Sequence, residues 1–394
     1  MSKYTHFIKL TPLEQFCFGG ESFASKEEKV FYFQRSREFP QQTSLLGLLR
    51  YQLLLQNGML EFRNGRETLR RQSNGKAGLL VGSRGFDPLP EYCPANFGVI
   101  SQLSPVFITH KSHRHLLPFP GVKAWAEKNM QNHQPVFELS RQGKACLMGD
   151  VTLADARPLS LLHHYSPKLG FEHGFRDSDS GEFVCHKEVF VENMEPQIGI
   201  FKAHTLDHRR KAGSPEQEGF FKIQYQRLQP GYAFGLYVQL SDSASFSSQP
   251  MVMFGKERSP FQMEVQELKT DERTPFERPL PELKAGDYLW LASSARLNPQ
   301  QLYAFCEAVL TEEESFRCMV SELSETCNYY GRPEKRSGMQ QPNGKLLLSQ
   351  RYNLMKRGSV LKLTSSLSEA QRKLLSDPAF QLIGYNHFLT VKPQ

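Results

Sequence analysis

Residues 39–50 read FPQQTSLLGLLR and predict the start of a helix. A proline is tolerated at or before the first turn of a helix, and the threonine or serine that follows can accept hydrogen bonds from the free amides there. Leucines recur at positions 45, 48, 49 and 53, which gives the helix an apolar face. We therefore expect a helix over residues 43–56 that ends at Asn57-Gly58.

A second stripe of the same helix carries Thr43, Gly47 and Arg50 at spacings of four and three. Glycine inside a helix costs up to ~1 kcal/mol relative to alanine, and close approach by a partner would justify that cost. A helix N-terminus with free amides, a glycine and an arginine one turn on would form a seat for a phosphate. Tight packing of the helix on a sheet, with a solvated arginine, explains the same residues equally simply.

The composition describes a globular, moderately basic protein. The chain has 394 residues, a formal net charge of +7, and 39% hydrophobic and 23% charged residues, so we expect two domains rather than one core. Its seven cysteines are scattered without a C-x-x-C pair, which favours a reducing cytoplasm over a disulfide framework. No run approaches the roughly 18 apolar residues of a membrane span, and the N-terminus does not read as a signal peptide.

Strand patterns dominate the chain. We expect strands near residues 4–10, 30–33, 97–109, 134–140, 144–149, 182–192, 198–204, 219–228, 232–240, 261–268, 284–292 and 379–391. We expect further helices near 299–310, 312–322 and 367–376, and a long loop over 165–181. Strands interleaved with few helices, twice over, predict two α+β domains of ferredoxin-like type, at residues 1–180 and 181–394.

The histidines give little support to a metal site. His110, His113 and His115 lie close together, but Lys111 and Arg114 between them would repel a cation. We therefore expect no metal and no cofactor.

A general acid or base acting on RNA is the catalytic alternative. It would use His113 or His115 with Lys111, or else His204 or His208 with Lys211. No spacing singles out one arrangement, and no nucleophile elbow, phosphate loop or dinucleotide fingerprint occurs. We expect a protein that is not an enzyme.

Loops that combine glycine with cations point instead to an extended anion. They lie at residues 168–170, 208–213, 255–258 and 356–358. Glycine lets backbone amides approach phosphate, while lysine and arginine supply salt-dependent attraction. Phe18, Phe175 and Tyr385 lie beside glycines, where exposed rings would stack on unpaired bases.

Four groups of motifs, in this order along the chain, resemble one known family. They are Leu10-x-Pro12 with FGGES at 18–22, QTSLLGLLR at 42–50, Ile198-Gly199-Ile200 with EGFF at 218–221, and FGKERS at 254–259 with Gly358-Ser359-Val360. The set is similar to the third subunits of Cmr-type (type III-B) CRISPR effector complexes, which are RAMP proteins of the Cas-five-like group.

The resemblance implies two ferredoxin-like (RRM-like) RAMP domains with β-hairpin and loop insertions. It also implies a non-catalytic cytoplasmic subunit that holds the 5′ tag of the CRISPR RNA. Its protein partners would be the large polymerase-like subunit and the backbone RAMP subunit of the same complex, with no membrane and no cofactor. In that setting Thr43, Ser44, Gly47 and Arg50 would seat a tag phosphate, and Lys356 and Arg357 would serve RNA or an acidic partner surface.

The complete set of expected RNA-binding residues is Gly19, Gly20, Ser22, Gln42, Thr43, Ser44, Gly47, Arg50, Lys168, Lys202, Arg209, Arg210, Lys211, Lys256, Arg258, Lys356 and Arg357. Two other functions stay open. One is a metal-independent RAMP ribonuclease that processes precursor CRISPR RNA with a histidine. The other is a structural spacer whose basic stretch at residues 332–362 meets acidic protein surfaces.

Overall fold

Strand β1 (His6–Pro12) lies inside the largest sheet of the computed structural model. Its alternate residues His6, Ile8 and Leu10 are buried, as in any strand with one covered face. Its two neighbours, β13 (Ala233–Leu240) and β15 (Ser259–Glu267), come from much later in the chain. The second half of the chain therefore builds the first strand into its sheet.

The structure describes residues 3–391 except 20–21, 26–29, 64–65, 83–85, 87, 89–95, 113, 122–171, 203–217, 242–243, 270–271, 279, 303, 312, 322–345 and 350. The other strands of the large sheet are β6 (Ile100–Leu103), β7 (Phe107–Thr109), β8 (Leu116–Gly121), β9 (Glu172–Asp177), β10 (Phe183–Cys185) and β14 (Gln249–Phe254). The order is β10-β9-β8-β7-β13-β1-β15-β14, with β6 also paired to β13.

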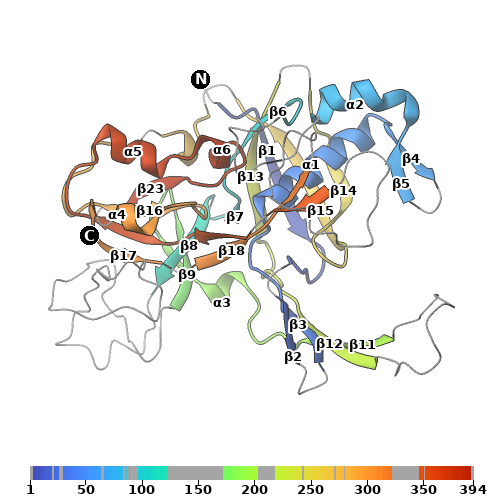
Figure 1. The fold of residues 1–394 in the computed structure, drawn as a ribbon, viewed down its shortest axis with the longest axis horizontal. Coiled ribbons are helices and arrows are strands. Elements are labelled where there is room, and N and C mark those ends of the chain that lie inside the picture. Colours follow the sequence, from blue (N-terminus) through green and yellow to red (C-terminus); the bar gives the residue numbers. More distant parts are fainter. Residues whose placement is uncertain are drawn as a thin grey trace.

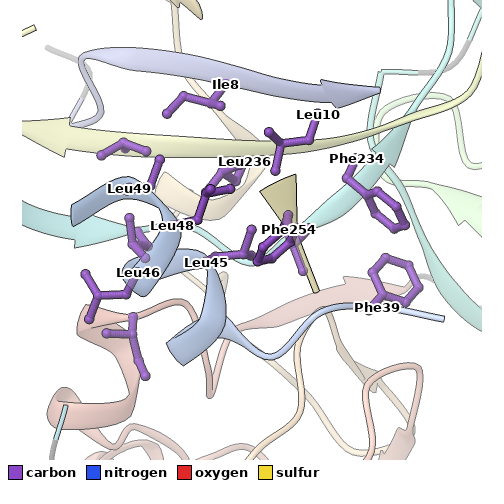
Figure 2. Close-up of a cluster of buried hydrophobic side chains, with 14 of the residues drawn as sticks. Ile8, Leu10, Phe39, Leu45, Leu46, Leu48, Leu49, Phe234, Leu236 and Phe254 are labelled. Carbon is purple, nitrogen blue, oxygen red and sulfur yellow. The ribbon is translucent and has the colours of Figure 1, made fainter. Parts of the chain in front are cut away.

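Helix α1 (Gln42–Gln56) covers one face of this sheet and confirms the helix expected over 43–56. Its leucines enter a core cluster that also contains residues of β1 and β13, such as Leu10 and Leu236 (Figure 2). Each fully buried leucine stabilises the fold by about 1.5–3 kcal/mol. Helix α2 (Asn74–Val81) lies against α1. The apolar stripe read from the sequence thus faces the sheet as predicted.

A second sheet packs on the opposite face of the first. Its strands are β17 (Cys306–Leu310), β22 (Val360–Leu363), β16 (Tyr288–Leu291) and β23 (Phe388–Val391), in that order. Aromatic residues of both sheets, among them Tyr237 and Trp290, share one buried cluster. The Trp290 indole donates to the Pro118 carbonyl at 2.8 Å. The large sheet is therefore the middle layer, between α1 and the second sheet.

A third sheet projects from the body (Figure 1). Its order is β11 (Gln197–Lys202), β12 (Glu218–Gln224), β3 (Val30–Arg35) and β2 (Ser22–Ser25), with β12 and β3 parallel. Directly after β12, Gln226 exchanges backbone hydrogen bonds with Phe16. The sheet is therefore tied at its base to the segment that follows β1.

Short elements complete the fold. They are the hairpin of β4 (Leu60–Arg63) and β5 (Arg66–Leu69), the pair β18 (Glu313–Phe316) and β21 (Tyr352–Met355), the pair β19 (Met319–Ser321) and β20 (Leu346–Leu348), the helices α3 (His186–Val189), α4 (Pro299–Leu302), α5 (Glu369–Leu375) and α6 (Pro378–Leu382), and the 3₁₀ turns η1 (Arg71–Ser73) and η4 (Pro275–Glu277).

Most of the expected strands in the described residues are present, as is the expected helix at 367–376, found as α5. Of the two helices expected over 299–310 and 312–322, only the start of the first is present, as α4 (Pro299–Leu302), and the strands β17, β18 and β19 form in the rest of that range. Pairing of β17 with β22 overrides the helical pattern there. The ends of two expected strands are also wrong, since α3 follows β10 and α6 precedes β23. The runs at 134–140 and 144–149 lie outside the described residues.

The long loop expected over 165–181 contains a strand instead. Residues of β9 pair with β8 along six positions. The glycine that suggested a loop, Gly174, lies within the strand, where the Phe183 ring occupies the space that a Cβ would need. A glycine in a strand often marks such close approach.

Mostly antiparallel sheets with few helices confirm the mixed α+β class. The large sheet takes strands from both sides of residue 180, and the division at that residue stays a prediction. In the described part of the chain, no helix has the length and apolar character needed to span a membrane.

A buried histidine, His387, predicts that the stability of the fold depends on pH. The Nε2 atom of His387, just before β23, is buried without a hydrogen-bond partner, and burial lowers the pKa of His387 to about 4. The unfolded histidine has a pKa near 6.5, so between about pH 6.5 and 4 only the unfolded chain gains this proton. Stability should therefore fall by about 3 kcal/mol as the pH drops across that window.

Urea unfolding at several pH values checks this contribution. His387→Gln should make the loss of stability between pH 6.5 and 4 smaller than in the parent chain. An unchanged pH slope in the variant would show that folding does not lower the pKa of His387.

Candidate nucleic-acid interface

The turn between β14 and β15 presents two of the expected RNA-binding cations. Gly255, Glu257 and Arg258 have φ values of 81°, 59° and 53°, in the left-handed region. For a residue other than glycine this conformation is strained, and such strain persists only where the surroundings impose it. The turn holds Arg258 at the surface, while Lys256 is half-buried.

Contacts with the segment after β1 impose this conformation. The Lys256 amide donates to the Cys17 carbonyl at 2.7 Å, and the Lys256 ammonium donates to the Gln34 side chain. A Cβ on Gly255 would lie 2.7 Å from the same Cys17 carbonyl oxygen, so only glycine fits there. The Ser259 hydroxyl accepts from the Cys17 amide at 3.4 Å. The turn is therefore fixed on the body rather than free in solvent.

Gln34 of β3 brings three predicted segments together. Ser22 of β2 is paired with Gln34 in the antiparallel ladder of β2 and β3. Gly19 is exposed, and a Cβ built on it would lie 3.6 Å from the side-chain nitrogen of Gln34. The side-chain oxygen of Gln34 accepts a hydrogen bond from the Lys256 ammonium. Gln34 therefore links Gly19, strand β2 and the turn at residues 255–258. Gly19 and Lys256, which are 237 positions apart in the sequence, thus lie near the same Gln34 side chain.

The N-terminus of α1 does not form the expected phosphate seat. Gln42 is fully buried, and its backbone amide donates a hydrogen bond to the Tyr385 hydroxyl at 3.3 Å. Its side-chain amide donates to the carbonyls of Ser104 and Ile383, each at 2.7 Å. The prediction that Gln42 contacts RNA is therefore wrong. The protein itself occupies the helix start that an anion would need.

The rest of the predicted helix residues divide between two environments. Thr43 is half-buried, while Ser44 and Gly47 are exposed, and nothing lies within 4 Å of a Cβ built on Gly47. Arg50 turns away from them, since its guanidinium donates to the Gly82 carbonyl at 2.9 Å and burial lowers its pKa. Arg50 thus binds the protein backbone, and only Ser44 and Gly47 offer an open surface.

Arg357 is a structural residue and not an RNA contact. It is 8% exposed, its guanidinium donates to the Val106 carbonyl at 3.1 Å, and its Cζ lies 4.3 Å from the centroid of the Phe39 ring. Burial lowers its pKa. The prediction that Arg357 meets RNA or a partner surface is therefore wrong, whereas Lys356 is half-buried and stays a candidate.

The three rings expected to stack on bases are also inside the protein. Phe18, Phe175 and Tyr385 are 3%, 1% and 1% exposed. The glycine next to Tyr385, Gly384, has a φ of +86° and serves a turn. A neighbouring glycine was therefore the wrong signal for an exposed ring.

Five expected RNA-binding residues lie outside the described residues: Gly20, Lys168, Arg209, Arg210 and Lys211. Lys202 ends β11 opposite Glu218 of β12. The structure gives these six residues no further test.

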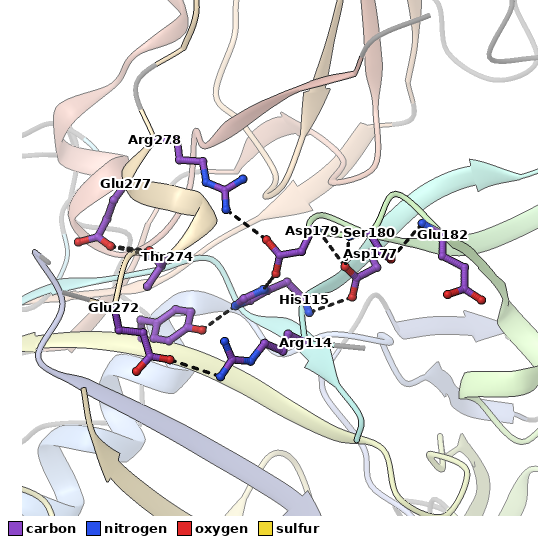
Figure 3. A network of polar contacts seen from close by, with 11 residues as sticks. Arg114, His115, Asp177, Asp179, Ser180, Glu182, Glu272, Thr274, Glu277 and Arg278 are labelled. Atoms are coloured by element: carbon purple, nitrogen blue, oxygen red, sulfur yellow. Dashed lines mark hydrogen bonds and ion pairs between the residues drawn. The ribbon is translucent and has the colours of Figure 1, made fainter. Parts of the chain in front are cut away.

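His115, the catalytic alternative, is closed on both sides (Figure 3). It is 4% exposed, with Nδ1 2.6 Å from an Asp179 carboxylate oxygen and Nε2 2.6 Å from the Tyr237 hydroxyl. The hydrogen bond from His115 is the main cause that lowers the pKa of Asp179, and Arg278 pairs with the same carboxylate at 3.3 Å. With both ring nitrogens engaged, His115 has no nitrogen to offer a substrate. Among the other candidates, His113, His204 and His208 lie outside the described residues.

Sequence reasoning missed Gln34 and Arg35, which end β3 beside the cationic turn. The Arg35 guanidinium is exposed and donates to the Gln224 side chain of β12 at 3.0 Å. The sequence predicts a strand over 30–33, and the polar residues that follow it at the start of a connection are the signal that could have pointed to this site. Within the described ranges, no group of three or more His, Cys, Asp or Glu residues is arranged to hold a metal ion.

Comparison with known proteins gives one family. The model of the family described as "CRISPR-associated protein (Cas_Cmr3)" matches residues 8–393. No curated protein sequence matches the chain. Among solved structures, a cryo-EM structure of the Type III-B Cmr-beta bound to cognate target RNA and AMPPnP contains a chain with 12% identity and a TM-score of 0.42, with 97% of this chain and 96% of that chain covered. A structure of Cmr-beta bound to cognate target RNA gives 13% identity, a TM-score of 0.43 and the same coverage.

Proposed function

The chain belongs to the Cas_Cmr3 family of CRISPR-associated proteins, as its motifs predict, and on this premise we propose that it is a non-catalytic RNA-binding subunit of a type III-B Cmr effector complex. In this proposal it holds the 5′ tag of the CRISPR RNA and bridges the large polymerase-like subunit to the backbone RAMP subunits. It does so in the cytoplasm, through two ferredoxin-like domains.

The observation that carries the proposal is the fixed cationic turn at residues 255–258. Three left-handed residues and two anchors to the body hold Lys256 against Gln34, which lies near the exposed Gly19, and hold Arg258 at the surface of the same turn. A preorganised pair of cations next to exposed backbone suits a phosphate chain, because little side-chain entropy is lost on binding. The closed environment of His115 supports a binding role over a catalytic one.

The test is the double variant Lys256→Ala/Arg258→Ala in the assembled complex, with binding to CRISPR RNA measured over a range of salt concentrations. Each lost charge-assisted hydrogen bond is worth about 1.5–3 kcal/mol, so affinity for the tag should fall at least tenfold. The slope of log affinity against log salt should become shallower by about one for each lost phosphate contact.

The matched control is Lys269→Ala/Arg273→Ala. It removes the same charge from two exposed residues beyond the other end of β15. Equal losses in both double variants would mean that net charge alone matters, and tag affinity that survives in Lys256→Ala/Arg258→Ala would refute the proposed site.

A further inference from the structure

Phe62 of β4 is an aromatic ring held out in water. It is 76% exposed, and near it in the chain Leu55 is 44% and Leu69 40% exposed. Full burial of a phenylalanine side chain stabilises a fold by about 1.5–3 kcal/mol, and in the isolated chain Phe62 does not contribute this stabilisation. The hairpin therefore offers a ring to a binding partner.

The register of the hairpin places Phe62 next to a second ring. Phe62 pairs directly with Glu67 across β4 and β5, so both side chains lie on one face of the hairpin, with Cβ atoms about 5 Å apart. The Glu67 carboxylate accepts a hydrogen bond from the Tyr51 hydroxyl of α1 at 2.8 Å. Phe62 and Tyr51 therefore flank the same carboxylate.

Arg258, in the β14–β15 turn, is near enough to Tyr51 for its charge to be felt there. Its positive charge acts on Tyr51, where it opposes the rise in pKa that burial and Glu67 cause. Arg258 is exposed, and among the described residues its guanidinium has no ion pair or hydrogen bond. An unpaired guanidinium thus lies within electrostatic range of the Tyr51 hydroxyl.

The surface of α1 next to Tyr51 is open. Gly47 lies one helical turn before Tyr51 on the same stripe, and nothing occupies the space above it within 4 Å. Ser44 continues this exposed stripe. A polymer backbone that passes the rings has room to continue along the helix.

Charge decides the chemistry of the occupant. Arg63, Arg70 and Lys76 are further exposed cations on the hairpin and on α2, while the carboxylate of Glu67 is held by Tyr51. Rings that alternate with guanidinium groups bind unpaired bases and phosphates together, because every base has a face to stack and every nucleotide a charge. The surface fits single-stranded RNA.

We propose that Phe62 and Tyr51 form a stacking platform for unpaired bases of a single-stranded RNA, and that Arg258 holds the phosphate beside them. The proposal rests on the proposed function and adds to it an aromatic surface formed by α1 and the β4–β5 hairpin. It assigns base contact to the α1–hairpin surface and phosphate contact to the turn.

The test uses the full chain and a short single-stranded RNA that carries 2-aminopurine, whose fluorescence is quenched when it stacks. Phe62→Ala should weaken binding about 5- to 100-fold and relieve quenching, the range found for loss of one base–ring stack. Its salt slope should match that of the parent chain, because no charge is lost. Phe62→Trp should restore both affinity and quenching.

The control variant is Phe183→Ala, which removes an exposed phenylalanine from a different hairpin, at β10, and should bind like the parent chain. RNA with an abasic sugar at the quenched position should bind the parent chain and Phe62→Ala equally. A loss in Phe62→Ala that persists with abasic RNA would overturn the platform.

Two further outcomes separate the platform from the wider function. If Lys256→Ala/Arg258→Ala weakens RNA binding and Phe62→Ala does not, the platform is wrong and the RNA-binding function stands. If Phe62→Ala leaves RNA binding intact but disrupts copurification with the other Cmr subunits, the surface binds protein and the platform is again wrong.

Discussion

Gly384→Ala is expected to lower the free energy of unfolding by more than about 4 kcal/mol. Gly384 has a φ of +86°, and a Cβ built on it would overlap the Gln42 side-chain nitrogen and the Ser104 carbonyl oxygen. The added methyl group would therefore break the two hydrogen bonds that Gln42 donates inside the core. A buried polar group left without a partner costs about 1–3 kcal/mol, and overpacking adds a similar amount.

Gly286→Ala is the matched control for this variant. Gly286 has almost the same φ, +87°, but nothing lies within 4 Å of its Cβ position. This control isolates the cost of a left-handed alanine, about 1–2 kcal/mol. Urea or thermal unfolding of both variants gives the comparison, and equal losses of stability would show that the contact with Gln42 is not what makes Gly384 necessary.

Arg357→Ala is expected to destabilise the protein by about 3–5 kcal/mol without weakening RNA binding by the folded chain. The side chain fills the space against the Phe39 ring and satisfies the Val106 carbonyl, so its removal leaves both a cavity and an unpaired oxygen. Arg357→Met should lose less, since methionine keeps much of the volume and removes a buried charge.

Lys356→Ala serves as control, because it removes a half-buried cation at the neighbouring position and should cost less than about 1 kcal/mol. Thermal unfolding checks stability, and RNA titration below the unfolding transition checks binding. A shallower salt slope for Arg357→Ala would contradict the structural role and return Arg357 to the RNA interface.

The helix and strand patterns were predictable wherever local periodicity and burial agree. The leucines of α1 and the alternation in β1 lie in the core as their spacing indicates. Local patterns failed at residues 306–321, where pairing with distant strands decides the structure, and at Gly174, where a ring from the next strand does. Such contacts depend on residues far apart in the chain, so a short stretch of sequence does not reveal them.

The sequence predicts the kind of surface, a glycine-containing cationic turn, better than it predicts the individual residues of the candidate site. The motif at 254–259 correctly marked a special turn, because a glycine beside cations there meets a real conformational need. The same signal misled at Arg357 and Tyr385, where the neighbouring glycine serves a turn that takes the side chain inward. Tyr51 and Phe62 were missed because a half-buried or exposed ring looks, in sequence, like any core residue.

The pairing of β1 has a consequence for synthesis in the cell. Both strands that flank it end beyond residue 239, so the strand made first waits for partners while more than 220 residues are added. At roughly 5–20 residues per second, a ribosome needs about 10–45 seconds for that interval. During this time a nascent strand with free edges is exposed to the crowded cell, and the emerging polypeptide is expected to depend on a holdase chaperone.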